Sequence, residues 1–269
     1  MDRDGARVRF VTWGSRAGGL PLLALHGLSS NALFWSRIAA RLPDIQVIAP
    51  DQRAHGRTGA APGYAPADYV ADAVAVLDRL AVPRAVVIGH SWGASVALAV
   101  AAGLPERVAA LIFADGGMWP RGGSFDDFAQ RVQPAFARWP SIDGAVEELR
   151  ADLGHAWGDD LVPFAHNGVT QHPDGWGSVL THDVRAVILR GFFDLGADRL
   201  WSRVTQPALV AVAGHKPPEW LARTRASLEL VRAAAPHVLE KWYDSPHDIP
   251  LYLADEFAAD VRRVIAAAA

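Results

Sequence analysis

The residues best able to carry out chemistry form a short motif in the first half of the chain. Residues 89–93 read Gly-His-Ser-Trp-Gly, which fits the pattern G-x-S-x-G. They stand between an expected buried strand at residues 85–89 and an expected helix at residues 92–103. A sharp strand-to-helix turn strains its central residue and exposes the serine hydroxyl at the edge of the sheet. The motif therefore predicts Ser91 as a nucleophile; the plainer alternative is that Ser91 only caps the helix.

A nucleophilic serine needs a base, and histidines follow several of the expected strands. His247 comes after the last one, at residues 238–243, and this order of serine before histidine is typical of G-x-S-x-G enzymes. A neutral imidazole accepts the serine proton and later returns it to the leaving group. We therefore predict His247 as the base. Two competitors are less well placed, because His237 precedes that strand and His215 follows an earlier one.

The third catalytic group is an acid that orients the imidazole and stabilises the imidazolium. Asp115 directly follows an expected strand at residues 109–114. The loop after the next strand, at residues 208–213, contains no Asp and offers Glu219 instead. We predict Asp115 as the acid and keep Glu219 as the alternative; the simpler reading of Asp115 is a capped turn.

A developing oxyanion needs N–H donors aimed at it. His26, Gly27 and Leu28 follow an expected strand at residues 20–25, and a glycine lets this loop turn its N–H groups toward the cleft. The N-terminus of the helix behind Ser91 offers a free N–H group as well. We predict the N–H groups of Leu28 and Trp92 as the oxyanion hole, with Gly27 as the fallback donor. For His26 we expect a structural imidazole bonded within its own loop.

The elements that must position these groups are short apolar runs, each followed by a helical pattern. Continuous apolar runs are typical of strands that are covered on both faces, and strand–helix alternation indicates a doubly wound, mostly parallel α/β sheet. We expect strands at residues 7–13, 20–25, 46–50, 85–89, 109–114, 208–213 and 238–243, and helices at residues 31–42, 67–80, 92–103, 220–234 and 251–267.

One region lacks this alternation. Residues 116–204 are rich in Trp and Phe, with helical patterns such as residues 124–137 and 142–153 between Gly- and Pro-bearing turns. We predict a helical cap there, inserted between late strands of a core domain formed by residues 1–115 and 205–269. Its aromatic residues suggest a hydrophobic substrate, and we predict that Trp119 and Trp176 bind it. The alternative is that they form the cap's own core.

Composition excludes several classes of protein. Of 269 residues, 51% are hydrophobic, 20% are charged and none is cysteine, with a formal net charge of −3. These values fit a well-packed core and exclude disulfides, cysteine ligands and a cysteine nucleophile. We expect no metal, because no helical His pair or compact carboxylate cluster is found, and no nucleotide cofactor, nucleic acid or membrane partner. We expect a cytoplasmic monomer or homodimer whose charged N-terminus is no signal peptide.

Taken together, these residues resemble the α/β-hydrolase superfamily. The shared features are His26-Gly27, a polar loop at residues 51–57, the motif at residues 89–93 and the terminal His247. We expect that polar loop to brace the cleft by internal pairing. The chain departs from the usual pattern in lacking an Asp after residues 208–213, and the position of Asp115 is similar to that of the acid in zearalenone-type lactone hydrolases.

The resemblance implies a serine hydrolase acting on a carboxylic ester or lactone of a small hydrophobic substrate. Related dehalogenases and epoxide hydrolases carry Asp in place of Ser91, so acyl transfer to serine is favoured. The superfamily leaves two alternatives open. One is a carbon–carbon bond hydrolase of a diketone-type substrate; the other is a ligand receptor with slow turnover.

Overall fold

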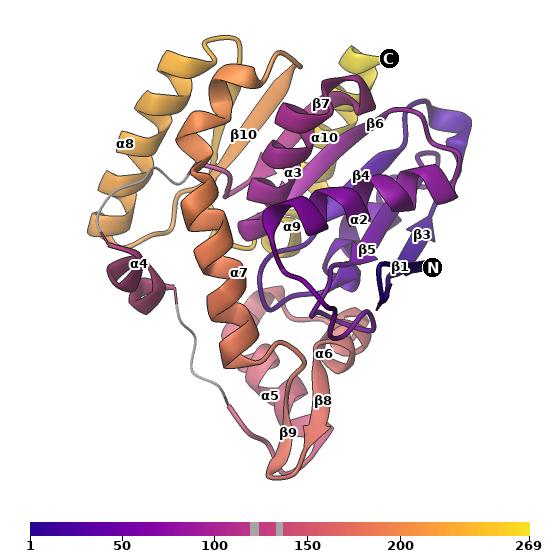
Figure 1. Ribbon diagram of the computed structural model, residues 1–269, viewed down its shortest axis with the longest axis vertical. Coiled ribbons are helices and arrows are strands. Elements are labelled where there is room, and N and C mark those ends of the chain that lie inside the picture. Colours follow the sequence, from indigo (N-terminus) through magenta and orange to yellow (C-terminus); the bar gives the residue numbers. More distant parts are fainter. Residues whose placement is uncertain (119–123, 133–136) are drawn as a thin grey trace.

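A computed structural model describes residues 1–118, 124–132 and 137–269 of the chain. Within these residues the centre of the molecule is a seven-stranded sheet of order β11-β10-β7-β6-β4-β5-β3 (Figure 1). Only β3 runs antiparallel to its neighbour, which is β5; the other pairs are parallel. The strands are β3 (Arg9–Trp13), β4 (Leu22–Leu25), β5 (Val47–Asp51), β6 (Ala85–His90), β7 (Val108–Ala114), β10 (Ala208–Ala213) and β11 (Leu239–Tyr243). This architecture confirms the predicted doubly wound, mostly parallel fold.

Helices cover both faces of this sheet, and further helices lie in the segment between β7 and β10. They are α1 (Ser36–Ala40), α2 (Pro66–Arg79), α3 (Trp92–Gly103), α4 (Phe125–Arg131), α5 (Ile142–Leu153), α6 (Val162–Asn167), α7 (His182–Leu195), α8 (Pro218–Ala234), α9 (Ile249–Tyr252) and α10 (Ala254–Ala268). The predicted helices 92–103 and 142–153 have the bounds of α3 and α5. The predicted helix 31–42 starts instead as a 3-10 turn, Ala32–Trp35, before α1. The predicted helix 251–267 is interrupted at Leu253, whose φ of −124° and ψ of 46° are not helical.

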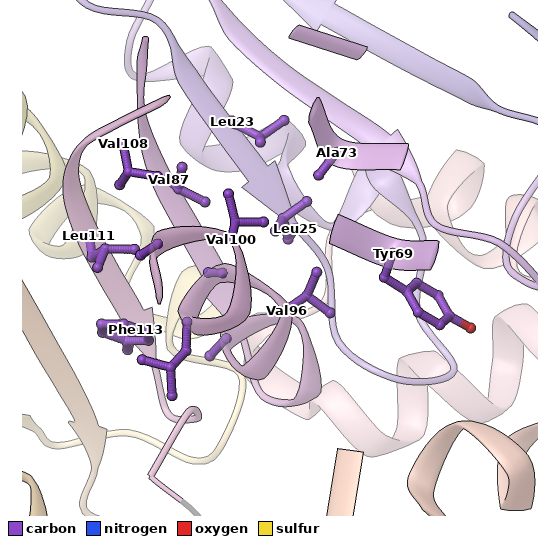
Figure 2. Packing of buried hydrophobic residues seen from close by; sticks show 14 of the residues in the cluster. Leu23, Leu25, Tyr69, Ala73, Val87, Val96, Val100, Val108, Leu111 and Phe113 are labelled. Atoms are coloured by element: carbon purple, nitrogen blue, oxygen red, sulfur yellow. The ribbon is translucent and has the colours of Figure 1, made fainter. Parts of the chain in front are cut away.

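The five inner strands are almost wholly apolar, because alternate residues face opposite layers and both faces are covered. The edge strands β3 and β11 are partly exposed and contain charged residues. In β4, Leu23 and Leu25 pack into a cluster with α2, α3 and α8, whereas Leu22 and Ala24 pack into a second cluster with α1 and α10. Figure 2 shows part of the first cluster, including Leu23 and Leu25 on β4 and Val96 on α3. Burial on both sides fixes the sheet, and with it the edge at which the parallel strands end.

The elements between β7 and β10 are mostly helical, and α4, α5, α6 and α7 lie among them (Figure 1). They also include a small hairpin of β8 (Val169–His172) and β9 (Gly175–Ser178), which the sequence patterns did not predict. The strands are four residues each and carry two glycines in β9, so they lack a clear apolar alternation. The Pro-Asp-Gly sequence at residues 173–175 is a turn signal that could have indicated the hairpin.

Side-chain hydrogen bonds join this region to the sheet. Arg37, on α1, donates to Asp160 at 2.7 Å and to the carbonyl of Ala156 at 2.7 Å. Asn167, at the end of α6, donates to Asp51 at 3.2 Å. Since Asp51 ends β5, this contact ties the segment between β7 and β10 to the edge of the sheet where the candidate catalytic residues lie. No helix in the described ranges is both long and apolar enough to span a bilayer.

Two further strands lie at the N-terminus, β1 (Asp2–Arg3) and β2 (Ala6–Arg7). They pair antiparallel to form a sheet of their own. The predicted strand at residues 7–13 is therefore divided, and its second part forms β3 at the edge of the main sheet.

Candidate active site

Ser91 sits in a strained turn between β6 and α3. Its φ of 52° and ψ of −121° are unfavourable for a residue with a side chain. The Ser91 N–H donates to the carbonyl of Ala114 at 2.9 Å, which holds the turn against β7. Although Ser91 occupies the N-cap position of α3, its hydroxyl accepts no hydrogen bond from the helix. The plainer reading of Ser91 as a helix cap therefore lacks its defining contact.

Glycines make this turn possible. A Cβ atom at Gly89 would collide with the backbone of α3, and one at Gly93 would collide with the backbone of β4 and the loop that follows it. A Cβ at Gly116 would collide with the carbonyl group of Ser91. The three glycines therefore let β4, β6, β7 and α3 approach one another closely around the serine.

Asp115 and His247 are 132 residues apart in the sequence and in direct contact in the fold. Nδ1 of His247 lies 2.6 Å from Oδ2 of Asp115. The other carboxylate oxygen of Asp115 accepts the N–H of Ala213 at 3.0 Å and a hydrogen bond from the Lys216 ammonium. Asp115 is 2% exposed, whereas the His247 side chain is 46% exposed. The carboxylate is thus fixed on several sides while the imidazole remains accessible.

This contact shifts the pKa of each partner. Burial alone would raise the pKa of Asp115, but hydrogen bonds and positive charge from His247 and Lys216 outweigh it and lower that pKa. Burial alone would lower the pKa of His247, but the hydrogen bond and negative charge of Asp115 outweigh it and raise that pKa. Asp115 is therefore ionised at neutral pH and stabilises a positive charge on the imidazole.

Lys216 is a residue of this site that the sequence reasoning missed. It lies in the loop after β10, which contains no Asp. Its ammonium contacts Asp115, which follows the neighbouring strand β7. The signal was present, because a lysine directly after a parallel strand must lie near the ends of the adjacent strands. The alternative acid, Glu219, is exposed in the first turn of α8. No hydrogen bond among the described residues joins Glu219 to His247.

The loop after β4 passes directly beside Ser91. A Cβ atom at Gly27 would lie 3.3 Å from Cβ of Ser91 and 2.9 Å from Nδ1 of His90, so only glycine fits there comfortably. Leu28 follows and lines the same cavities as Ser91. Within the described part of the chain, the N–H groups of Leu28 and Trp92 donate no hydrogen bond to another protein atom. Both predicted oxyanion donors are therefore free beside the serine.

Ser91 borders two cavities. One, of about 110 Å³, lies under α4 and α7 and is mostly apolar; it is lined by Leu28, Ser91, Trp92, Ser95, Leu98, Phe128, Val132, Arg185, Leu189, Phe192, Phe193, Leu195, Gly196, Ala197 and Leu200. The other, of about 190 Å³, is lined by Gly27, Leu28, Ser29, Ser30, Phe34, His90, Ser91, Leu149, Phe164, His247, Asp248 and Leu251. Ser91 and Leu28 line both cavities, whereas His247 lines only the second and Trp92 only the first.

Comparison with known proteins agrees with this geometry. Residues 21–206 match the model of a family described as the alpha/beta hydrolase fold. The chain belongs to the α/β-hydrolase fold family. The match includes the loop after β4, the turn at Ser91 and Asp115, while His247 lies beyond it.

Relatives of this α/β-hydrolase fold protein include several named hydrolases. Lipase LipV of Mycobacterium tuberculosis is 30% identical over 150 residues, which is 51% of this chain and 58% of LipV. Epoxide hydrolase A of the same organism is 36% identical over 116 residues, which is 41% of this chain and 36% of that protein. The matched segments thus span about a third to three fifths of these curated relatives.

A crystal structure of E-2-(acetamidomethylene)succinate hydrolase shows the same fold over nearly the whole chain. It superposes with a TM-score of 0.78 at 22% identity, covering 97% of this chain and 96% of that one. At this identity the likeness establishes the fold alone.

Two histidines near the site are structural. His26 donates from Nδ1 to the carbonyl of Gly27, at 2.8 Å, and accepts the N–H of Gln52 on Nε2, at 3.0 Å. His55 contacts the Arg53 carbonyl and the Ser29 N–H in the same way. Burial lowers the pKa of His26 to about 4 and that of His55 to about 3, so both rings are neutral. The expectation of a structural His26 is confirmed.

The polar loop at residues 51–57 braces the cleft only partly by internal pairing. Asp51 accepts the N–H of Arg57 at 2.8 Å, which is a contact within the loop. Arg53 instead pairs with Asp72 on α2, through bonds of 2.7 and 2.8 Å. The loop is therefore anchored to α2 as well as to itself.

Of the two tryptophans predicted to bind substrate, only Trp176 lies within the described residues. Trp119 lies outside the described residues. Trp176, in β9, exchanges two backbone hydrogen bonds with Trp139, at 2.8 and 2.9 Å. It lines neither of the two cavities that Ser91 borders.

A group of potential metal ligands also lies here. Among the described residues, His90, His247 and Asp248 bring one ligand atom each within 4.8 Å of one another. Nε2 of the buried His90 already lies 3.3 Å from the His247 carbonyl oxygen and 3.3 Å from Asp248. Its ring stacks on Phe34, with centroids 4.5 Å apart. These contacts explain His90 as a support for the loop that carries His247.

Proposed function

We propose that this protein is a serine hydrolase that cleaves a carboxylic ester or lactone of a small, largely apolar substrate through an acyl-enzyme on Ser91. The observation that carries the proposal is the His247–Asp115 hydrogen bond of 2.6 Å beside the strained turn of Ser91. Ser91 and His247 line the same cavity, and Asp115 is bonded to His247, although the three residues follow different strands.

In the first step the neutral His247 takes the proton of the Ser91 hydroxyl, and the serine oxygen bonds to the substrate carbonyl carbon. The carbonyl becomes an oxyanion, and the free N–H groups of Leu28 and Trp92 stabilise it. When the intermediate collapses, the carbon–oxygen bond of the ester breaks, and His247 gives its proton to the departing alkoxide. For a lactone this alcohol stays attached to the acyl group.

The second step reverses the roles. A water molecule gives a proton to His247 and its oxygen bonds to the acyl carbon. The bond to Ser91 then breaks, His247 returns the proton to the serine oxygen, and the carboxylic acid leaves. Asp115 remains ionised throughout and stabilises the imidazolium in both steps, in accord with its lowered pKa.

The experiment that tests this proposal is labelling with a fluorophosphonate probe together with turnover of p-nitrophenyl butyrate. Wild type is compared with Ser91→Ala and His247→Ala. We expect the probe to modify Ser91, and both variants to lose labelling and turnover. Wild-type protein that neither labels at Ser91 nor hydrolyses any member of an ester and lactone panel would refute the proposal.

A further inference from the structure

The cavity under α7 contains a buried cation that has no anionic partner among the described residues. Arg185, in the first turns of α7, is 7% exposed and lines the same cavity as Ser91. Its guanidinium donates to the Ser29 hydroxyl at 2.6 Å and to the Val132 carbonyl at 2.5 Å. Both acceptors are uncharged, and Nε has no hydrogen-bond partner. Thus two of the roughly five donors of a guanidinium are used.

No carboxylate neutralises this charge. Among the described residues, no Asp or Glu oxygen forms an ion pair with Arg185. The residues outside the description, 119–123 and 133–136, contain neither Asp nor Glu. Burial lowers the pKa of Arg185 to about 10, so the side chain still carries its charge at neutral pH.

Arg53 shows how this chain buries an arginine for structural purposes. It is 2% exposed and forms a bidentate pair with Asp72, at 2.7 and 2.8 Å. A buried charge without such a partner is strongly unfavourable, because the lost hydration is not replaced. The contrast separates Arg185 from an ordinary structural arginine.

We propose that Arg185 binds a carboxylate of the substrate, so that the preferred substrates are esters or lactones that carry a free carboxylate group. This inference rests on the proposed hydrolase function and adds the chemical class of its substrate. A guanidinium binds a carboxylate through two parallel hydrogen bonds, and Nε is one of the donors used in that geometry.

The surroundings of Arg185 place this carboxylate close to the reaction centre. Arg185 donates to Ser29, which directly follows the oxyanion donor Leu28. Apart from Ser91 and Ser95, the rest of the cavity is lined by apolar residues, Phe128 and Phe192 among them. The substrate that fits is therefore amphipathic, with a short apolar segment between the carboxylate and the ester carbonyl.

A purely structural role for Arg185 does not explain why a charged side chain is buried at this position. The bonds to Ser29 and Val132 would hold α7 against the loop after β4, and a neutral side chain could provide them without a buried charge. Such a role predicts that loss of Arg185 affects charged and uncharged substrates equally. The binding role predicts that it affects only the charged ones.

The experiment compares two esters of equal length, monoethyl adipate and ethyl hexanoate, which differ in a terminal carboxylate. Wild type should show the higher kcat/KM for monoethyl adipate. Arg185→Gln should lower kcat/KM for that ester roughly 10- to 100-fold, mainly through KM, and change it by less than about threefold for ethyl hexanoate. Arg185→Lys should recover part of the loss.

Arg37→Gln is the matched control, because Arg37 also links the cap region to the core but lines neither cavity at Ser91. It should leave the ratio of the two kcat/KM values unchanged. Equal kcat/KM for both esters in wild type, or an equal loss on both in Arg185→Gln, would overturn the carboxylate site.

A binding measurement separates this inference from the proposed function. Calorimetric titration of the Ser91→Ala variant with monoethyl adipate should give a Kd roughly 10- to 100-fold lower than that of the Ser91→Ala/Arg185→Gln double variant. Binding that is equal in the two variants contradicts the carboxylate site whether or not Ser91 is catalytic. Conversely, a wild type without Ser91-dependent turnover contradicts the hydrolase, while Arg185-dependent binding would still support the carboxylate site.

Discussion

The carboxyl edge of the sheet and the wall of the cavity under α7 differ in the partners that they give to a buried charge. At the sheet edge, Asp115 accepts hydrogen bonds from Ala213, His247 and Lys216, and buried His26 uses both ring nitrogens. On the cavity wall, the buried Arg185 keeps an unpartnered Nε. The sheet edge also contains buried atoms without a partner, such as Nδ1 of His90, so the contrast is one of charge. Asp115 contacts His247 and Lys216, whereas Arg185 forms no ion pair with a carboxylate among the described residues.

The difference follows from the elements that carry each group. The sheet edge is set by backbone pairing, as in the bond from Ser91 N–H to Ala114, and by glycines that allow close approach. The part of the cavity wall that α7 supplies packs on the core through apolar side chains such as Ile188 and Phe192 and through the bond from Arg185 to Ser29. Changes at the edge should therefore remove chemistry, and changes on the wall should alter substrate preference.

The largest expected effect tests whether chemistry is confined to the sheet edge. Ser91→Ala should lower kcat by on the order of 10⁴- to 10⁶-fold, because no other group forms the acyl-enzyme. Ser95→Ala is the matched control, since Ser95 lines the same cavity one helical turn further along α3. It should change kcat by less than about threefold. The measurement is the turnover of p-nitrophenyl butyrate. If both variants lost kcat to a similar extent, the loss in Ser91→Ala would reflect altered packing and not the missing nucleophile.

The second effect concerns the choice of acid. Asp115→Asn should lower kcat by about 10³- to 10⁴-fold, because an amide neither stabilises the imidazolium nor selects the right tautomer. Glu219→Gln should leave kcat within about twofold, since Glu219 is exposed on α8. Steady-state kinetics of the two variants distinguish the two candidate acids. A large loss of kcat in Glu219→Gln but not in Asp115→Asn would assign the acid to Glu219, after β10.

A third test addresses the tight packing behind the serine. Gly116→Ala should destabilise the protein by about 2–4 kcal/mol, because the new Cβ atom would collide with the Ser91 carbonyl group. Gly103→Ala, at the end of α3, meets nothing within 4 Å and should be neutral or slightly stabilising. Urea unfolding of both variants measures the difference. A stable Gly116→Ala protein would show that the edge is more adaptable than its contacts suggest.

The smallest expected effect is a shift in pH dependence. His247 acts as a base only when neutral, so kcat/KM falls as the pH drops below the pKa of His247. The positive charge of Lys216 lowers that pKa. Lys216→Met should therefore move the acidic limb of the kcat/KM profile to higher pH. Lys241→Met, which removes a lysine that pairs with Asp260 instead, should leave the limb unchanged. An unmoved or downward-shifted limb in Lys216→Met would contradict the electrostatic coupling.

Local patterns were sufficient to predict the sheet and the turn at Ser91. Continuous apolar runs identified the five inner strands of the main sheet within about two residues, because burial on both faces leaves little room for polar residues. The edge strands β3 and β11 were also predicted within about two residues, although they are partly exposed and contain charged residues. The glycines around Ser91 and the strand–helix alternation have the same local origin. The hairpin β8–β9 was missed, because short strands with glycines carry no such periodic signal.

The sequence by itself determined the fold, the strained serine and the strand ends at which Asp115 and His247 stand. Only the tertiary structure decided that these two residues meet, that Lys216 contacts the same carboxylate, and that Arg185 is buried without a counter-charge. The physical reason is the distance along the chain over which each effect acts. Periodicity and turn chemistry act over a few neighbouring residues, whereas the pairing of a buried charge depends on every element that packs around it.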